Sequence, residues 1–223
     1  MAKLVENHIK SKGVNVITGY GVAAFLGRDG VLTRIKLKNG TELDCELAVV
    51  AIGVTPNVEL AKFSGIAIVA LGGISVDEYM RTSDKDIYAI GDCVEIPNRI
   101  TGKIVLAPYG DLANLEGRVA GENAVVGDTV TFPGTIQTGI CKVFDFAAGS
   151  TGLSESAAIK NGFADAVSVV NASTDIPGFM KGKVVVPKMV ADRKTGKILG
   201  AQVMGPGTVA RQVAQWALAI RAA

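Results

Sequence analysis

The sequence has few of the residues that build disulfide frameworks, metal sites and aromatic binding surfaces. Its 223 residues include three cysteines, Cys45, Cys93 and Cys141, and a single histidine, His8. The cysteines are odd in number and far apart, with no C-x-x-C pair, so neither a disulfide framework nor a metal site is expected. Aromatic residues make up only 5% of the chain. With so few aromatic residues to stack on bases and no basic block, the chain lacks the features of a nucleic-acid-binding protein.

Long hydrophobic runs and a strong net charge are also absent. The longest stretch without a charged residue, Phe63–Val76, has 14 residues and three glycines, which is short of the ~20 apolar residues of a membrane span. The opening sequence MAKLVENHIK carries charges where a signal peptide has its apolar core. We therefore predict a cytoplasmic protein with no membrane segment. The formal net charge of +2 gives no reason to expect a nucleic-acid partner.

Apolar residues and glycine, by contrast, are plentiful. Hydrophobic residues make up 48% of the chain, which is enough for a sizeable core, and 27 of the 223 residues are glycine. So much glycine indicates many tight turns and close backbone approaches, which favours an α/β fold. The length suits one large domain or two small ones.

The first third of the chain has the pattern of a helix followed by an antiparallel meander. We expect a helix at Ala2–Lys12, strands at Val14–Ile17, Gly21–Leu26, Val31–Lys38 and Leu43–Ile52, and an Asn39-Gly40 hairpin turn. The last strand includes the continuously apolar run Leu47–Ile52, which is typical of a strand covered on both faces.

Changes in composition divide the chain into three predicted domains, residues 1–62, 63–130 and 131–223. A short helix should run from Thr55 to Lys62. The second domain should contain a buried strand at Ile87–Ile90 and a helix at Pro108–Val126. The third should contain short strands around Lys142–Phe146, a helix from Ser154, a strand at Ala166–Val170, a hairpin of Val184–Ala191 with Ile198–Met204, and a closing helix whose stripe is Val209, Val213, Trp216, Ala217 and Ile220.

One glycine motif resembles a dinucleotide fingerprint. Gly19 to Ala24 reads G-x-G-x-x-A, and Glu42 and Asp44 follow about 20 residues later. A true fingerprint must open a helix whose N-terminus holds the pyrophosphate. Turn signals and an alternating run occupy that place here, so we reject the motif. The rival hypothesis, a small nucleotide-binding domain, predicts NAD binding that depends on Gly21.

A Gly-Asp pair after an apolar run is the stronger candidate site. Gly91-Asp92 follows Ile87–Ile90, and the carboxyl edge of a sheet is where ligands of open α/β folds bind. Glycine removes the Cβ that would block a ligand, and the Asp92 carboxylate suits a polyol hydroxyl. The alternative is that Asp92 only caps the next loop.

These residues carry a resemblance to a known family. The segment Thr82-Ser83-x-x-Asp86-Ile87-Tyr88-Ala89-Ile90-Gly91-Asp92-Cys93 resembles the second FAD-binding motif of the pyridine nucleotide-disulfide oxidoreductases, and Val50–Asn57 is similar to the motif that links their NAD and FAD domains. Segments 149–155 and 196–202 resemble their C-terminal dimerisation domain. The likeness is greatest to the branch of NADH oxidases, NADH peroxidases and coenzyme A disulfide reductases.

The resemblance implies both a fold and a set of site residues. The fold would be α/β and α+β, with remnants of FAD- and NAD-binding Rossmann-like domains followed by an α+β dimerisation domain that forms a homodimer. Asp92 would bind the FAD ribityl chain, Gly91 would allow close contact, and Leu106 and Ala107 would lie against the flavin. The helix after them would stabilise negative charge on the flavin, and Gly53 would let the chain pass close to NAD(P)H.

The departures from the family pattern suggest that this chain resembles only a C-terminal portion. Neither glycine-rich nucleotide loop nor the redox cysteine of the family has a match here, and both ends of the sequence read as interrupted elements. We therefore assign no catalytic residue and predict that the isolated chain is inactive. Alternatives are a non-catalytic dimerisation module and a half-enzyme that complements a separate N-terminal chain. The electron acceptor of the parent enzyme would be a disulfide, coenzyme A disulfide, peroxide or dioxygen.

Overall fold

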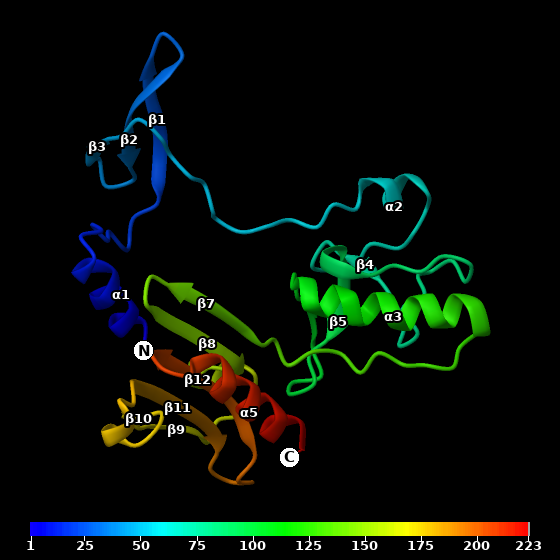
Figure 1. Cartoon of the computed structure of the whole chain (residues 1–223). Helices are drawn as coiled ribbons and strands as arrows, with labels where there is room; N and C mark the ends of the chain where they lie inside the picture. The colour runs from blue at the N-terminus through cyan, green and yellow to red at the C-terminus, as the bar shows by residue number, and fades with distance from the viewer. Residues whose placement is uncertain (223) are drawn as a thin grey trace. The chain divides into compact units, whose positions relative to one another are not determined.

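A computed structural model describes residues 1–222, and Ala223 lies outside the described residues. The chain divides into two compact units (Figure 1): Glu6–Val54 is one, and Met1–Val5 with the residues from Thr55 onward is the other. The first helix, α1 (Ala2–Ser11), confirms the predicted N-terminal helix. Among residues 1–222, no helix combines the length and the apolar character that a membrane crossing requires.

The unit Glu6–Val54 contains a three-stranded antiparallel sheet. Its strands are β1 (Val22–Arg28), β2 (Val31–Leu37) and β3 (Glu42–Asp44), in the order β1-β2-β3. Asp29 and Gly30 both have positive φ in the two-residue turn between β1 and β2, as the twist of a tight hairpin demands. The predicted hairpin turn at Asn39-Gly40 is confirmed. A strand and not a helix follows Gly21, which agrees with our rejection of the glycine motif.

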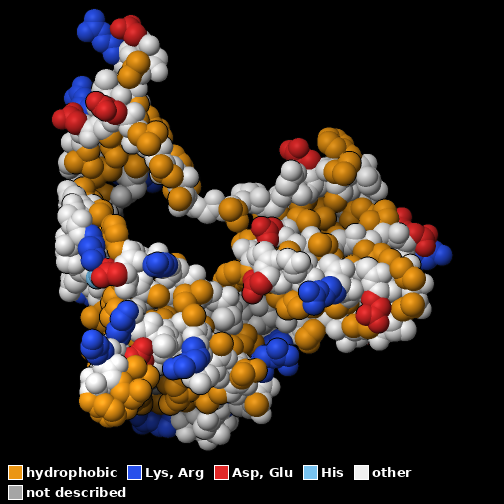
Figure 2. Space-filling model, in the orientation of Figure 1, with side chains coloured by type: hydrophobic (Ala, Val, Ile, Leu, Met, Phe, Trp, Pro, Cys, Tyr) orange, Lys and Arg blue, Asp and Glu red, His pale blue; other side chains and the backbone are white. Residues whose placement is uncertain are grey.

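Two strands predicted in this unit are wrong. Val14–Ile17 is not a strand, and the strand predicted at Leu43–Ile52 is reduced to β3. The apolar run is uncovered, since the exposed fractions are 81% for Leu47 and 93% for Ile52. A strand needs a neighbour for its backbone hydrogen bonds, and within residues 6–54 these two segments pair with no strand. Hydrophobic side chains accordingly lie on the surface of this unit (Figure 2).

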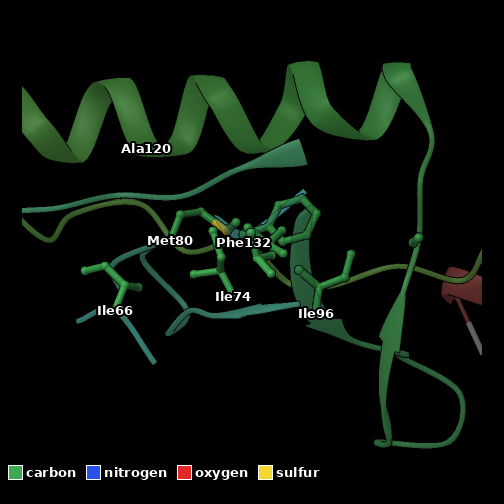
Figure 3. Close-up of a cluster of buried hydrophobic side chains, with 9 residues drawn as sticks. Ile66, Ile74, Met80, Ile96, Ala120 and Phe132 are labelled. Carbon is green, nitrogen blue, oxygen red and sulfur yellow. The ribbon is translucent and has the colours of Figure 1, made fainter. Parts of the chain in front are cut away.

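The second unit begins with a small mixed sheet and its helices. These elements are α2 (Glu59–Phe63), β4 (Ile74–Ser75), a 3-10 turn η1 (Gly91–Cys93), β5 (Val94–Pro97), β6 (Ile104–Leu106) and α3 (Gly110–Val126). The strand β5 is central, parallel to β4 and antiparallel to β6. The core beside α3 contains Ile66, Ile74, Met80, Ile96, Ala120 and Phe132 (Figure 3).

The buried strand predicted at Ile87–Ile90 is also wrong. The segment makes only an isolated bridge, Arg81 to Tyr88, and Ile87 is 40% exposed. Two backbone hydrogen bonds join the segment to residues 80–82. The Thr82 N–H donates to the Ile87 carbonyl oxygen, and the Ala89 N–H donates to the Met80 carbonyl oxygen. Because no continuous ladder forms, the segment is an extended connection that leads into η1.

A six-stranded antiparallel sheet dominates the rest of the unit. Its strands are β7 (Gly139–Val143), β8 (Phe146–Gly152), β9 (Ala166–Val170), β10 (Ser173–Thr174), β11 (Val184–Asp192) and β12 (Ile198–Gly205). The order is β10-β11-β12-β8-β7, and β9 also pairs with β11. This confirms the predicted hairpin and the strand at Ala166–Val170. Two short helical elements, α4 (Glu155–Lys160) and η2 (Gly178–Met180), lie in its connections.

The closing helix α5 (Val209–Ala222) packs on β8 and β12 as its apolar stripe predicts. Val209, Val213 and Ile220 are buried, while Trp216 and Ala217 pack against the same cores. The predicted helix start at Ser154 is confirmed as well, because its hydroxyl accepts the backbone N–H of Ala157.

Candidate functional site

The turn η1 presents an exposed carboxylate beside α3. Gly91 has φ +85°, a conformation that favours glycine, and a Cβ built on it would lie 3.6 Å from the Cβ of Ala113 on α3. Asp92 follows and is exposed. The structure therefore shows a glycine at positive φ and an exposed carboxylate at this turn, although no strand precedes them. Their role in binding a ligand stays a prediction.

Leu106 and Ala107 connect β6 to α3. Leu106 pairs with Glu95 of β5 and is half-buried, and Ala107 is buried. The helix begins at Gly110, and its N-cap residue Tyr109 makes no side-chain capping bond. The first backbone N–H groups of α3, like those of any helix, have no partner within the helix and form the positive end of its dipole. The carboxylate of Asp111 in the first turn offsets part of that positive charge.

Gly73 and Glu95 hold η1 and β6 close together at one edge of the small sheet. The Glu95 carboxylate is buried and accepts backbone N–H groups from Leu71 and Gly73, both at 2.9 Å. A Cβ on Gly73 would lie 2.7 Å from Glu95 Cγ, 3.0 Å from Leu106 Cδ2 and 3.2 Å from the Cys93 carbonyl. Because Leu106 Cδ2 and the Cys93 carbonyl oxygen both surround this one position, Leu106 lies near the end of the turn that carries Asp92.

Glu116 is a buried carboxyl that the sequence analysis missed. It lies on α3 with an exposed fraction of 1%, and its Oε2 accepts the backbone N–H of Gly91 at 2.6 Å. Burial raises the pKa of Glu116, the charge of Asp92 raises it further, and the Gly91 N–H opposes both effects. The sequence did offer a signal for this buried residue, since Glu116 lies on the apolar face of the predicted helix with Ala120.

Cys93 has the environment of an unreactive thiol. Burial is the main cause that raises the pKa of Cys93, and the carboxylates of Glu116 and Asp92 raise it further. Its Sγ lies 3.5 Å from the carbonyl oxygen of Ile90. Because the thiolate is the reactive form, this site does not favour a redox role for Cys93.

A side-chain network joins the small sheet to the start of the six-stranded sheet. Gln137 has φ +58°, and its Nε2 lies 3.5 Å from the Leu106 carbonyl oxygen. Asn98, which is 1% exposed, donates from Nδ2 to Gln137 Oε1 at 3.3 Å. Sequence reasoning did not find these residues, since a polar contact between residues 31 positions apart has no local signature.

A cavity of about 730 Å³ lies between α3, residues 132–138 and α5. Apolar side chains such as Leu112, Phe132 and Leu218 line it together with Arg118 and Arg221, whereas Asp92 does not. The fifth predicted site residue, Gly53, belongs to the unit Glu6–Val54, where it is exposed with φ +116°. The structure places Gly91 and Asp92 in η1 beside α3, and Leu106 and Ala107 in the connection from β6 to that helix. The binding roles of all five predicted residues, Gly53 among them, stay predictions.

Comparison with known proteins identifies the family. The pyridine nucleotide-disulphide oxidoreductase family matches residues 1–108, and the dimerisation domain of the same family matches residues 138–223. The chain belongs to this family. The predicted resemblance and fold class are confirmed, while the predicted boundaries at residues 62 and 130 stay predictions.

Similar proteins within the family are oxidoreductases. The chain is 38% identical to the NAD(P)H sulfur oxidoreductase (CoA-dependent) of Pyrococcus furiosus over 76% of this chain and 38% of that protein. It is 32% identical to an NADH oxidase of Methanocaldococcus jannaschii over 99% of this chain and 48% of that protein. The solved structure of an NAD-dependent persulfide reductase from A. fulgidus has a TM-score of 0.95 and 44% identity, covering 100% of this chain and 41% of that one. The chain thus spans less than half the length of these oxidoreductases.

Proposed function

We propose that this chain is the C-terminal portion of an FAD-dependent NAD(P)H oxidoreductase. The observation that carries the proposal is the Gly91–Asp92 turn, which lies against α3 near Leu106, within a sequence that matches the oxidoreductase family. The names of similar proteins, persulfide reductase and NADH oxidase, support the same reaction class. The acceptor would be a disulfide, coenzyme A disulfide, peroxide or dioxygen.

The residues present suit the ribityl chain and ring of FAD. Asp92 offers an exposed carboxylate that would accept hydrogen bonds from ribityl hydroxyls, and Gly91 leaves room for close approach. Leu106 and Ala107 would lie against the ring, and the N-terminal N–H groups of α3 would stabilise negative charge there. Gly53 would face NAD(P)H. When bound, FAD supplies the capacity to accept a hydride from NAD(P)H.

This part of the protein would bind and orient cofactor without performing turnover. No residue of it is assigned a catalytic role, and we propose that the isolated chain is inactive. Residues 138–222 would form a homodimer, as the match to the family's dimerisation domain indicates. We also propose a separate N-terminal half as a partner, and we propose no nucleic-acid or membrane partner. The proposed location is cytoplasmic.

A non-catalytic dimerisation module is the second candidate. The six-stranded sheet has buried clusters of its own, which include Val185, Val190, Leu199 and Val203. Such a region has enough core to act as a scaffold without flavin. This candidate predicts a dimer that does not bind FAD.

A flavin titration combined with a mass measurement tests both candidates. The dialysed chain is titrated with FAD, flavin fluorescence and the visible spectrum are recorded, and the molecular mass is measured on the same sample. The proposed function predicts saturable binding that D92A weakens. The matched control is E122A, because Glu122 is an exposed carboxylate on α3, outside the segment that resembles the FAD-binding motif. A colourless dimer that leaves FAD fluorescence unchanged would instead support the scaffold.

A further inference from the structure

Glu116 makes a contact that its own helix does not require. An exposed fraction of 1% is costly for a carboxylate, so such groups are kept where hydrogen bonds compensate for lost water. The groups that act on its ionisation are the Gly91 N–H and the carboxylate of Asp92, with no cation among them. The bond of 2.6 Å to the Gly91 N–H is therefore the compensating interaction.

The Val94 N–H closes this turn by donating to the Gly91 carbonyl oxygen, and the Glu116 bond is the hydrogen bond that joins the start of the turn to α3. Gly91 is the residue type with the greatest backbone freedom, and the Asp92 side chain is exposed. Two small residues of α3 let the chain approach closely: a Cβ on Gly117 would lie 3.6 Å from Ile90 Cδ1, and Ala113 lies equally close to the Cβ position of Gly91. Apolar contact therefore brings the turn near α3, but contact alone does not define its orientation.

We propose that Glu116 is the positioning residue of the flavin site. Its carboxylate holds the Gly91 N–H on α3 and thereby fixes where Asp92 presents its carboxylate relative to the N-terminus of that helix. The role in flavin binding rests on the proposed function, whereas the hold on the turn does not. Because Glu116 is buried, its proposed role is exerted through the Gly91 N–H and not through contact with the flavin.

Amide hydrogen exchange at Gly91, measured by NMR, tests the hold on the turn. Losing a hydrogen bond to a charged acceptor should speed exchange at Gly91 about tenfold in E116A. E116D keeps the charge but shortens the side chain by one methylene, so it should behave like E116A. E116Q still offers an acceptor oxygen and should restore protection. The amide of Val190 in β11 should exchange equally in all variants, which separates a local effect from global destabilisation.

An FAD titration of the same variants tests the consequence for the site. E116A and E116D should weaken FAD binding about tenfold, in proportion to the lost bond, while E116Q binds like wild type. The control is E122A, because Glu122 is an exposed glutamate on the same helix.

Three results would overturn the proposal in whole or in part. Unchanged exchange at Gly91 in E116A overturns the positioning role, even if FAD binds. Loss of protection in E116Q as large as in E116A also overturns it, because the acceptor is retained there. If the exchange rate at Gly91 changes in the Glu116 variants as expected but the wild-type chain does not bind FAD, the proposed function and the role of Glu116 in flavin binding are overturned. The hold of Glu116 on the turn then stands.

Discussion

The six-stranded sheet and the unit Glu6–Val54 contain similar apolar runs in opposite environments. In β11, Val185 and Val190 are completely buried, whereas Leu47 is 81% and Ile52 is 93% exposed. Neighbouring strands flank β11 on both sides, and the helix α5 packs on the same sheet. The difference shows that an apolar run stabilises a fold only when partners cover it.

Truncating one leucine in each region should give the largest contrast. L199A removes a completely buried side chain and should lower the free energy of unfolding by about 4 kcal/mol. L47A removes a side chain that is 81% exposed and should change it by less than about 0.5 kcal/mol. Urea unfolding, followed by circular dichroism and by the fluorescence of Trp216 on α5, measures both. Similar losses in the two variants would refute the contrast.

Glycine-to-alanine substitutions should give the next largest difference in stability between the two regions. A Cβ on Gly200 would lie 2.1 Å from the Leu153 carbonyl oxygen, so G200A should force the backbones apart and cost about 3 kcal/mol. Gly40 has φ +88° with open space around it, so G40A should cost only the backbone strain of about 1 kcal/mol. The midpoints of urea unfolding measure both, and a larger loss in G40A would show that turn strain outweighs close packing.

Two carboxyls should give opposite pH dependences within the second unit. Burial raises the pKa of Glu116, so its contribution to stability falls as the pH rises from the unfolded value of about 4.3 through the higher folded value. The Thr195 hydroxyl lowers the pKa of Asp192, so that contribution is lost as the pH falls below about 3.9 through the lower folded value.

Unfolding of wild type, E116Q and D192N from acid to neutral pH measures this difference. Wild type should lose stability as the pH rises above about 4.3, and E116Q should lack this decrease. Wild type should also lose stability as the pH falls below about 3.9, and D192N should lack that decrease. An unchanged pH slope in E116Q would contradict the assigned environment of Glu116.

The same contrast explains which features the sequence predicted. The hairpin β11–β12 and the strand Ala166–Val170 were predictable because their partner strands follow nearby in the chain. The α5 stripe was predictable because the helical spacing of its apolar residues marks one face for burial. The run Leu47–Ile52 has a strand's composition, but composition does not supply the neighbouring strand that its hydrogen bonds require.

The candidate site was predictable only where local backbone chemistry marks it. Gly91 and Asp92 form a dipeptide with a recognisable conformational role. Glu116 lies 25 positions away from Gly91, and Gln137 lies 31 positions away from Leu106. The contact of Glu116 arises from the approach of α3 to η1, and that of Gln137 from the approach of the segment before β7 to β6. No short motif encodes either approach.

Surface ion pairs should show the smallest difference between the two regions. Arg34 and Glu42 join β2 to β3 at 2.5 Å, and Lys188 of β11 contacts Glu155 at 2.9 Å. All four side chains are partly exposed, so screening and side-chain entropy should limit each coupling energy to about 0.5 kcal/mol. Double-mutant cycles with R34M/E42Q and K188M/E155Q measure the two couplings by urea unfolding. Equal small coupling energies would mean that the burial of apolar side chains causes the stability difference between the two regions. A coupling energy above about 2 kcal/mol in one region would mean that its ion pair causes part of that difference.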